Sequence, residues 1–320
     1  MGDIIFTTPL VRCLKLQLGV EIHYLTKRSF APLLNGNPHI YRIWTIDQKI
    51  SEVLPALKAE KFDLVLDLHK SLRSWQTRLA LRKPVLSFDK LTFEKWLMVR
   101  LKINRLPKLH ISERYLQGVR KLGITDDRAG MDFFIPPSDQ IFPHQLHPSL
   151  RTGRYIAFVI GAAHATKRLP REKIAETCRL IPHPIALIGG PAERETGEWI
   201  TVNAGTHVVN TCGQLNLNQS ASLLQQSTCV IAHDTGMMHI AAALKKEVVS
   251  VWGSTIPEFG VWPYYPEEFK GSQAIIEVKN LPCRPCTRFG RSECPKGHFN
   301  CMQKIEAHNI ASAVLKIVPL

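Results

Sequence analysis

The sequence has no apolar run long enough to span a bilayer, and it has no basic and apolar leader at its start. It also lacks a G-x-G-x-x-G sequence after a predicted strand, a P-loop and any Asp-x-Asp pair. The first two motifs bind dinucleotides and nucleoside triphosphates, so their absence argues against a dehydrogenase and an ATPase. The lack of Asp-x-Asp argues against a diphosphate site bridged by a metal. We therefore predict a cytosolic protein that needs no cofactor.

Acidic residues are few: 27 Asp and Glu stand against 41 Lys and Arg, which gives a formal net charge of +14. The excess is concentrated between Lys70 and Lys108, where there are eleven Lys or Arg and two acids. This charge indicates an anionic partner or substrate. A solvated helix face is the simpler interpretation, and nucleic acid, a phosphorylated lipid or an anionic membrane surface could each use the cluster.

Four of the eight cysteines are grouped near the C-terminus, as Cys283, Cys286, Cys294 and Cys301. In a cytosolic chain such a group indicates thiols or a structural metal rather than disulfides. The two longer gaps are short for a two-knuckle zinc site, so zinc and packed thiols both remain open.

Apolar stretches alternate with helix-patterned stretches along most of the chain. Predicted strands cover residues 21–25, 41–46, 62–68, 85–88, 154–161, 184–190, 207–211, 229–233 and 248–253. Predicted helices of the second half cover residues 170–181, 192–202, 217–227 and 236–244. This alternation predicts an α/β fold with parallel sheets covered by helices on both faces. Residues 135–154 contain four prolines and predict a linker between two doubly wound domains, with ligands in the cleft between them.

The strongest local signal is "CVIAHDTGMMHIAAAL", in which a buried strand ends at His233 and a helix follows. Free N–H groups at the start of a helix, together with the helix dipole, favour an anion. Thr235 and Gly236 allow a phosphate to approach the backbone, and His239 can reach the same ligand. The alternative is structural, with Asp234 as a helix cap and His239 as a partly buried helix residue.

Two further loops follow predicted strands in the same half. Lys167 lies where such a loop would present an ammonium group to a phosphate, although a surface lysine is the simpler reading. Glu193, in "IGGPAERE", could accept hydrogen bonds from ribose or sugar hydroxyls, or merely favour a helix N-terminus. At the start of the chain, Gly2 and Asp3 are expected in a loop. A helix is expected to follow, with Thr8 as its N-cap and Pro9 as its first residue.

Five stretches together resemble glycosyltransferase family 9, the heptosyltransferases of the lipopolysaccharide inner core. They are "GDIIFTTPLVRCLK", "DLHKSLRS", the Lys167 loop, "HDTGMMHIAAAL" and "PCRPC" with "CPKGHFNCMQKI". The resemblance implies a GT-B fold, with two Rossmann-like doubly wound domains facing a central cleft. It implies an acceptor-binding domain over residues 1–140 and a nucleotide-sugar domain over residues 150–320, whose last helix packs back on the first domain.

The resemblance also implies roles for single residues. Asp3 matches the catalytic base of the family, and Glu193 matches its nucleoside contact. The matches to its donor contacts are Lys167, Asp234, Thr235, Gly236 and His239. Two polar residues that precede the lysine in some members are Ala162 and Ala163 here, which leaves the donor open. For the acceptor we expect contacts from Lys70 and Arg73, directly after a predicted strand end.

The implied reaction is an inverting, metal-independent transfer of heptose from ADP-L-glycero-D-manno-heptose to an anionic lipid-linked acceptor, Kdo-lipid A or a heptosylated core. The protein would work at the cytosolic face of the inner membrane and bind no nucleic acid. Alternatives are another nucleotide sugar for a different surface glycan, a nucleotide-sugar epimerase, and a protein that only binds. Family members carry a strand before the Gly-Asp, so we expect the first strand to be missing here and Met1 to be an internal methionine or a truncation point.

Overall fold

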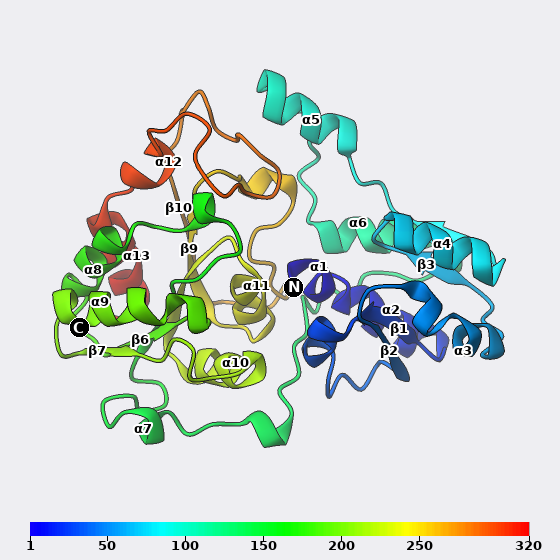
Figure 1. The fold of residues 1–320 in the computed structure, drawn as a ribbon, viewed down its shortest axis with the longest axis horizontal. Helices are drawn as coiled ribbons and strands as arrows, with labels where there is room; N and C mark the ends of the chain where they lie inside the picture. The colour runs from blue at the N-terminus through cyan, green and yellow to red at the C-terminus, as the bar shows by residue number, and fades with distance from the viewer. Residues whose placement is uncertain (320) are drawn as a thin grey trace.

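The computed structural model describes residues 1–319, and its strands and helices alternate along the chain (Figure 1). The last residue of the expected 150–320 domain lies outside the described residues. All nine predicted strands are present; β8 has the predicted ends, and the ends of the other eight are shifted. They are β1 (His23–Lys27), β2 (Arg42–Ile46), β3 (Val65–Asp67), β4 (Val85–Ser87), β5 (Ile156–Val159), β6 (Ile185–Ile188), β7 (Val208–Asn210), β8 (Cys229–His233) and β9 (Glu247–Trp252).

The second half is built on one parallel sheet of six strands in the order β10-β9-β8-β5-β6-β7. Alternate side chains of its central strands enter two separate apolar cores. One core contains side chains of α8 (Arg171–Arg179), α9 (Arg194–Ala204) and α13 (Ala307–Ile317), and the other contains those of α10 (Leu217–Gln226) and α11 (Gly236–Ala243). Helices therefore cover both faces, as in a doubly wound fold.

Two elements of this half differ from the expectation. The strand β10 (Gln273–Glu277) was not predicted, and it pairs with β9 at the edge of the sheet. The last helix, α13, was expected on the first domain, and this was wrong. Its apolar side chains, Ile310 and Val314 among them, are buried in the core formed with α8 and the sheet (Figure 1).

The first half contains two separate parallel pairs, β1–β2 and β3–β4. Its helices are α2 (Thr8–Leu18), α3 (Leu54–Ala59), α4 (Leu72–Leu81), α5 (Thr92–Leu101) and α6 (Ile111–Gly118). Arg28–Leu33 forms a 3-10 helix. The expected linker contains a second 3-10 helix, Pro137–Asp139, and one helical turn, α7 (Pro143–Leu146).

The start of the chain also differs from the expectation. Gly2 and Asp3 do not form a loop, because they belong to a single helical turn, α1 (Gly2–Ile5). The N-cap of α2 is Thr7 rather than Thr8, and Pro9 lies at the second helical position. Ile5 is fully buried, which holds α1 against the rest of the molecule.

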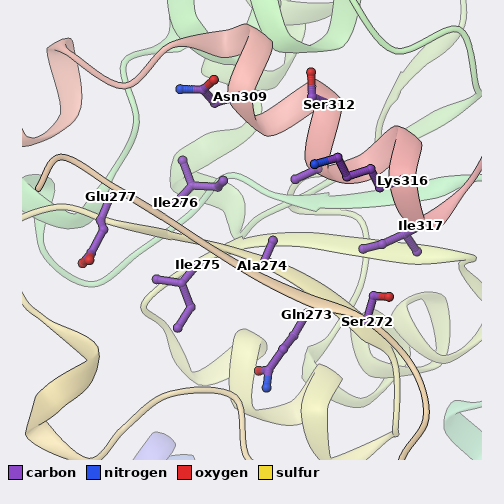
Figure 2. Close-up of a pocket in the computed structure, with 11 residues that line it drawn as sticks. Ser272, Gln273, Ala274, Ile275, Ile276, Glu277, Asn309, Ser312, Lys316 and Ile317 are labelled. Atoms are coloured by element: carbon purple, nitrogen blue, oxygen red, sulfur yellow. The ribbon is translucent and has the colours of Figure 1, made fainter.

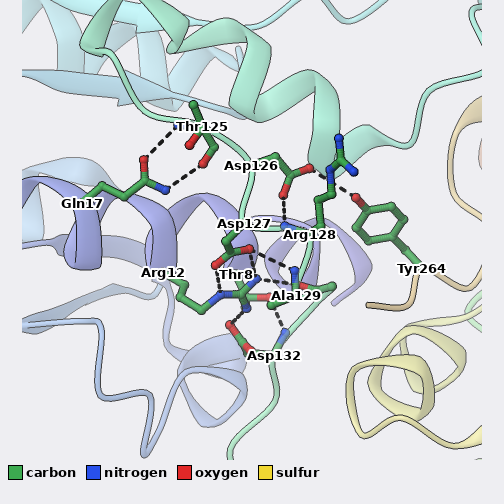
Figure 3. A network of polar contacts seen from close by, with 11 residues as sticks. Thr8, Arg12, Gln17, Thr125, Asp126, Asp127, Arg128, Ala129, Asp132 and Tyr264 are labelled. Carbon is green, nitrogen blue, oxygen red and sulfur yellow. Dashed lines mark hydrogen bonds and ion pairs between the residues drawn. The ribbon is translucent and has the colours of Figure 1, made fainter. Parts of the chain in front are cut away.

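The two halves are joined by a continuous apolar core that includes side chains of α1, α2, α6, α10 and α11. A polar network reinforces the junction (Figure 3). In this network Arg12 of α2 binds Asp127 at 2.7 Å, the Gly130 carbonyl at 2.8 Å and Asp132. The same loop reaches the second half, where Arg128 donates two 3.0 Å hydrogen bonds to Glu267.

Candidate active site

The predicted donor residues meet at the carboxyl edge of the six-stranded sheet. Lys167 follows β5, Glu193 follows β6 and Asp234 follows β8, and these three strands are neighbours. Successive connections from β5 lead to β6 and β7 on one side, whereas β8 pairs with β5 on the other side. Ligands of open α/β sheets bind where the strand order reverses in this way.

A short ion pair lies at that position. Lys167 Nζ is 2.6 Å from Asp234 Oδ2, and both side chains are largely buried, with 14% and 7% exposed. The Thr255 hydroxyl, at the end of β9, donates to the same Asp234 oxygen at 2.7 Å. The Lys167 loop is held in turn by hydrogen bonds between Thr166 and Ser254. Asp234 therefore fixes the ammonium group of Lys167 at the sheet edge.

The helix α11 begins directly beside this pair. Its N-cap is Thr235, not Asp234 as the structural alternative had it, and Thr235 makes no side-chain capping bond. The buried Thr235 hydroxyl oxygen has no hydrogen-bond partner. The first N–H groups of a helix lack partners within it and, with the dipole, attract an anion. Lys167 and the start of α11 thus form one electropositive site.

Glu193 lies beside the same edge but is already engaged. Its Oε2 accepts a hydrogen bond from the Gly190 amide at 2.9 Å, and its Oε1 is 3.4 Å from Arg168. Glu193 thus stands at a helix N-terminus, as the N-cap of α9, and its contact with ribose or sugar hydroxyls stays a prediction.

His239 connects this edge to the first half of the chain. It is 3% exposed, and its ring lies 4.4 Å from the ring of Phe6 in an edge-on arrangement. A Cβ on Gly2 would come within 3.1 Å of the His239 ring, so α1 and α11 pack closely. Burial lowers the pKa of His239 to about 4, which keeps the imidazole neutral near pH 7.

Asp3 is exposed on α1, next to this contact. Its negative charge acts on two lysines, Lys90 and Lys95, and opposes the lowering of their pKa values by burial. Burial, with nearby Arg114 and Arg288, lowers the pKa of Lys95 to about 8. The Arg114 side chain is buried, and two of its nitrogens, Nε and Nη2, have no hydrogen-bond partner. The Asp3 charge therefore acts on Lys90 and Lys95, and the charges of Arg114 and Arg288 act on Lys95 as well.

The sequence matches the profile described as "Glycosyltransferase family 9 (heptosyltransferase)" over residues 50–295. This chain belongs to glycosyltransferase family 9. It is therefore a glycosyltransferase. Lys70, Arg73, Lys167, Glu193 and the α11 signature lie within the matched residues, whereas Asp3 precedes them.

Individual relatives agree with the family. Over 112 residues the chain is 32% identical to Lipooligosaccharide heptosyltransferase 2 of Haemophilus influenzae, and this match covers only 32% of each protein. Lipopolysaccharide heptosyltransferase 1 of Pseudomonas aeruginosa is 24% identical over 90% of this chain and 84% of its own length. The E. coli heptosyltransferase WaaC with ADP has a TM-score of 0.68 and 19% identity, with 99% and 96% of the chains covered. The fold is GT-B, as expected.

The two acceptor residues expected in this family 9 chain lie apart from the ion pair at the sheet edge. Lys70 follows β3, and its Nζ donates to the Phe88 carbonyl at 2.9 Å. The Nζ of Lys90 lies 3.5 Å from the Lys70 carbonyl oxygen, and the charge of Asp3 acts on Lys90. Lys90 therefore links Lys70 to Asp3. Arg73 is exposed on the first turn of α4 and has no ion-pair partner among residues 1–319.

The segment from Cys283 to Cys301 holds a loop beside the site. Arg284 donates to the carbonyls of Gly253 at 2.7 Å and Thr255 at 2.9 Å, and so it holds the loop that orients Asp234. Cys283, Cys286 and Cys294 are half-buried and Cys301 is buried. Within the described part of the chain, no three His, Cys, Asp or Glu side chains are placed to hold a metal ion.

Sequence reasoning missed Thr255, Lys95, Arg114 and Arg288. Thr255 could have been found, because it follows a predicted strand of the same sheet. Lys95 lies in the basic segment between Lys70 and Lys108, but Arg114 and Arg288 carry no local motif, and only the fold brings them near Lys95. The pocket in Figure 2 contributes nothing to the site: it lies between β10 and α13, and none of the predicted site residues lines it.

Proposed function

We propose that this glycosyltransferase transfers heptose from ADP-L-glycero-D-manno-heptose to an anionic inner-core lipopolysaccharide acceptor, with inversion and without a metal. The observation that carries the proposal is the Lys167–Asp234 pair at the start of α11, packed beside the helical turn that presents Asp3. The names of the curated relatives, which are lipopolysaccharide heptosyltransferases, support the sugar and the acceptor.

On the donor side, the diphosphate lies at the start of α11. The α11 N–H groups, the unpartnered Thr235 hydroxyl and the Lys167 ammonium supply the donors and the positive charge. The Met1 side chain lies against Gly236, where a Cβ would come within 2.6 Å of the Met1 Cβ, so Met1 moves aside when the diphosphate reaches the backbone. Both contacts of Asp234 use Oδ2, and its Oδ1 accepts a heptose hydroxyl. The Glu193 carboxylate accepts a hydrogen bond from a ribose hydroxyl, and the neutral imidazole of His239 contacts the heptose.

The reaction is a single displacement. The acceptor hydroxyl oxygen attacks the anomeric carbon of heptose and gives its proton to the Asp3 carboxylate. The bond between the anomeric carbon and the diphosphate oxygen breaks on the opposite face, and ADP leaves with the electron pair. Lys167 and the α11 dipole stabilise the negative charge that grows on this diphosphate. One displacement inverts the anomeric configuration.

On the acceptor side, residues 1–140 form the acceptor domain and residues 150–320 the donor domain. Inner-core acceptors carry carboxylates and phosphates, and these groups match the unpaired cations near Asp3, Lys95 and Arg114 in particular. Lys70 and Arg73 extend the same positive surface. The reaction takes place at the cytosolic face of the inner membrane, where the lipid anchor of the acceptor lies. None of the helices in residues 1–319 is long and apolar enough to cross a bilayer.

A transfer assay with ADP-heptose and Kdo-lipid A tests the proposal. We expect ADP release only when the acceptor is present, together with a glycolipid that has gained one heptose by mass spectrometry. A panel of other nucleotide sugars serves as the control for the donor. ADP release without a glycolipid product, or transfer from a UDP-sugar alone, would overturn the proposed function.

A further inference from the structure

The helix α5 (Thr92–Leu101) projects from the body of the protein (Figure 1). Its inward side chain, Leu97, is 7% exposed, whereas Phe93 and Trp96 are 61% and 49% exposed. These two rings stack on each other, with centroids 6.2 Å apart and planes 14° apart. Leu101, the last residue of α5, and Ile103, just beyond it, are exposed as well. Large apolar side chains gathered on an outward face mark a docking surface rather than a core.

The same surface is strongly basic. Residues 92–108 contain five Lys or Arg and a single acid, Glu94. Arg100, Lys102 and Arg105 are exposed among the apolar side chains. The Nζ of Lys102 also donates to the Pro285 carbonyl at 2.6 Å, which ties the end of α5 to the second half. The helix is therefore held in place while its aromatic face remains uncovered.

We propose that this face, the α5 surface formed by Phe93, Trp96, Arg100, Leu101 and Ile103, docks on an anionic lipid bilayer. Aromatic rings beside Lys and Arg are the composition of helices that lie in a membrane interface. The excess of positive charge is complementary to anionic headgroups and would repel a second copy of the same basic surface. A helix this short binds weakly by apolar contact alone, so both kinds of contact are needed.

Docking of the α5 surface would also bring the active site close to the bilayer. Lys95 lies on the same helix, and its charge interacts with that of Asp3, while Phe93 and Trp96 are exposed. A bilayer that receives the aromatic face would therefore lie close to the carboxylate that we assign as the base. The membrane contact does not depend on the identity of the transferred sugar; only its usefulness to a lipid-linked acceptor rests on the proposed function.

Vesicle sedimentation tests the α5 surface without any glycolipid acceptor. The purified full chain is mixed with vesicles of phosphatidylethanolamine containing about one quarter phosphatidylglycerol, or with phosphatidylcholine vesicles. We expect binding to the anionic vesicles only, and a loss of binding when salt rises from about 0.1 M to about 1 M, where the Debye length falls from about 10 Å to about 3 Å. The double variant Phe93→Ser/Trp96→Ser should lower the partition coefficient by about tenfold or more.

Two controls make the result specific. Phe142 is as exposed as Phe93 but lies in the linker, so Phe142→Ser should leave binding unchanged. Circular dichroism and transfer to a delipidated, soluble acceptor should be unchanged in the Phe93→Ser/Trp96→Ser variant. Equal vesicle binding by this variant and the unsubstituted protein would overturn the proposal. Light scattering that shows a dimer dissociated by the double variant would also overturn it, because the face would then be occupied by a second copy.

Discussion

Lys167 and Asp234 form an ion pair at the sheet edge, where both side chains are largely buried. Lys167→Met would leave the Asp234 carboxylate buried without its cation, at a cost of about 3 kcal/mol in the free energy of unfolding. The double variant Lys167→Met/Asp234→Asn removes both charges and should recover most of that stability. Both variants should weaken ADP binding by at least about tenfold, because the ammonium group is gone.

Calorimetry of ADP binding and urea denaturation check this prediction together. Lys270→Met, at an exposed lysine outside the site, is the matched control and should change neither quantity. If the double variant folds and binds ADP as tightly as the unsubstituted protein, Lys167 does not contact the diphosphate.

Lys95 should make acceptor binding dependent on pH. Its pKa is lowered to about 8, chiefly by burial, so the side chain loses its charge as the pH rises through 8. Since the acceptor groups are anionic, we expect the KM for the acceptor to rise by about tenfold between pH 7 and pH 9. Lys95→Arg keeps its charge over this range and should flatten the profile. A Lys95→Arg enzyme with the same rise in KM would contradict the assignment.

At the scale of single residues, the side chains predicted for the donor lie at one edge of the sheet, and their roles stay predictions. Lys167, Glu193 and Asp234 could be found because parallel strands bring their carboxyl ends to one edge. Asp234 was expected as a possible cap, but the structure gives that position to Thr235 and uses Asp234 to hold Lys167. Arg114 could not be found, because nothing in its local sequence shows that it is buried near Lys95.

Among the elements, β8 and α11 carry buried histidines that should make the fold sensitive to acid. Burial lowers the pKa values of His233 and His239 to about 4. Between pH 6.5 and pH 4 the unfolded chain therefore binds more protons than the folded chain, so stability falls as the pH falls. From pH 7 to pH 5 we expect each histidine to remove about 2 kcal/mol from the free energy of unfolding.

Urea denaturation at the two pH values measures this loss. His239→Leu should reduce the pH dependence, whereas His308→Asn, at an exposed position of α13, should leave it unchanged. Identical pH dependence in His239→Leu and the unsubstituted protein would show that His239 does not resist protonation.

The loop that contains Gly130 packs between α2 and residues 264–267. It requires a glycine at position 130. Gly130 has a φ of +71°, and a Cβ there would lie 2.5 Å from the Pro266 nitrogen. Gly130→Ala should therefore lower the free energy of unfolding by more than 2 kcal/mol, roughly the sum of backbone strain and displaced packing. Gly153→Ala is the matched control, because Gly153 has a similar φ of +69° but no atoms within 4 Å of its would-be Cβ.

Thermal or urea denaturation of the two variants separates the contributions. An equal loss of about 1 kcal/mol in both variants would mean that only the backbone conformation matters. The prediction would then fail, and the junction between the loop and residues 264–267 would be looser than the structure shows.

Strands and helices were predicted well wherever they are buried on both faces. The strands β5, β6 and β8 are continuous apolar runs, and this pattern is what central parallel strands require. The edge strand β10 was missed because it is partly exposed and contains Gln273 and Glu277. The α1 turn was missed because four residues carry too little periodicity, and it is tertiary packing that makes them helical.

Over the whole molecule, the doubly wound α/β fold was predicted from the alternation of elements, and the GT-B architecture was implied by the family 9 resemblance. The sequence showed less clearly how the two halves of the chain pack on each other. One apolar core runs across both, and α1 packs on α11 rather than facing it from a distance. The expectation that the last helix returns to the first half was wrong, because the apolar face of α13 is complementary to the open face of the second sheet.

The central claim is that Asp3 from the first half and the start of α11 from the second half form one active site. The most direct test is the turnover number of Asp3→Asn with ADP-heptose and Kdo-lipid A, measured beside its dissociation constant for ADP. Asp63→Asn, at an exposed acid, is the control. We predict that Asp3→Asn lowers turnover by about a hundredfold or more while the ADP affinity stays within about twofold. Unchanged turnover in Asp3→Asn would contradict the claim.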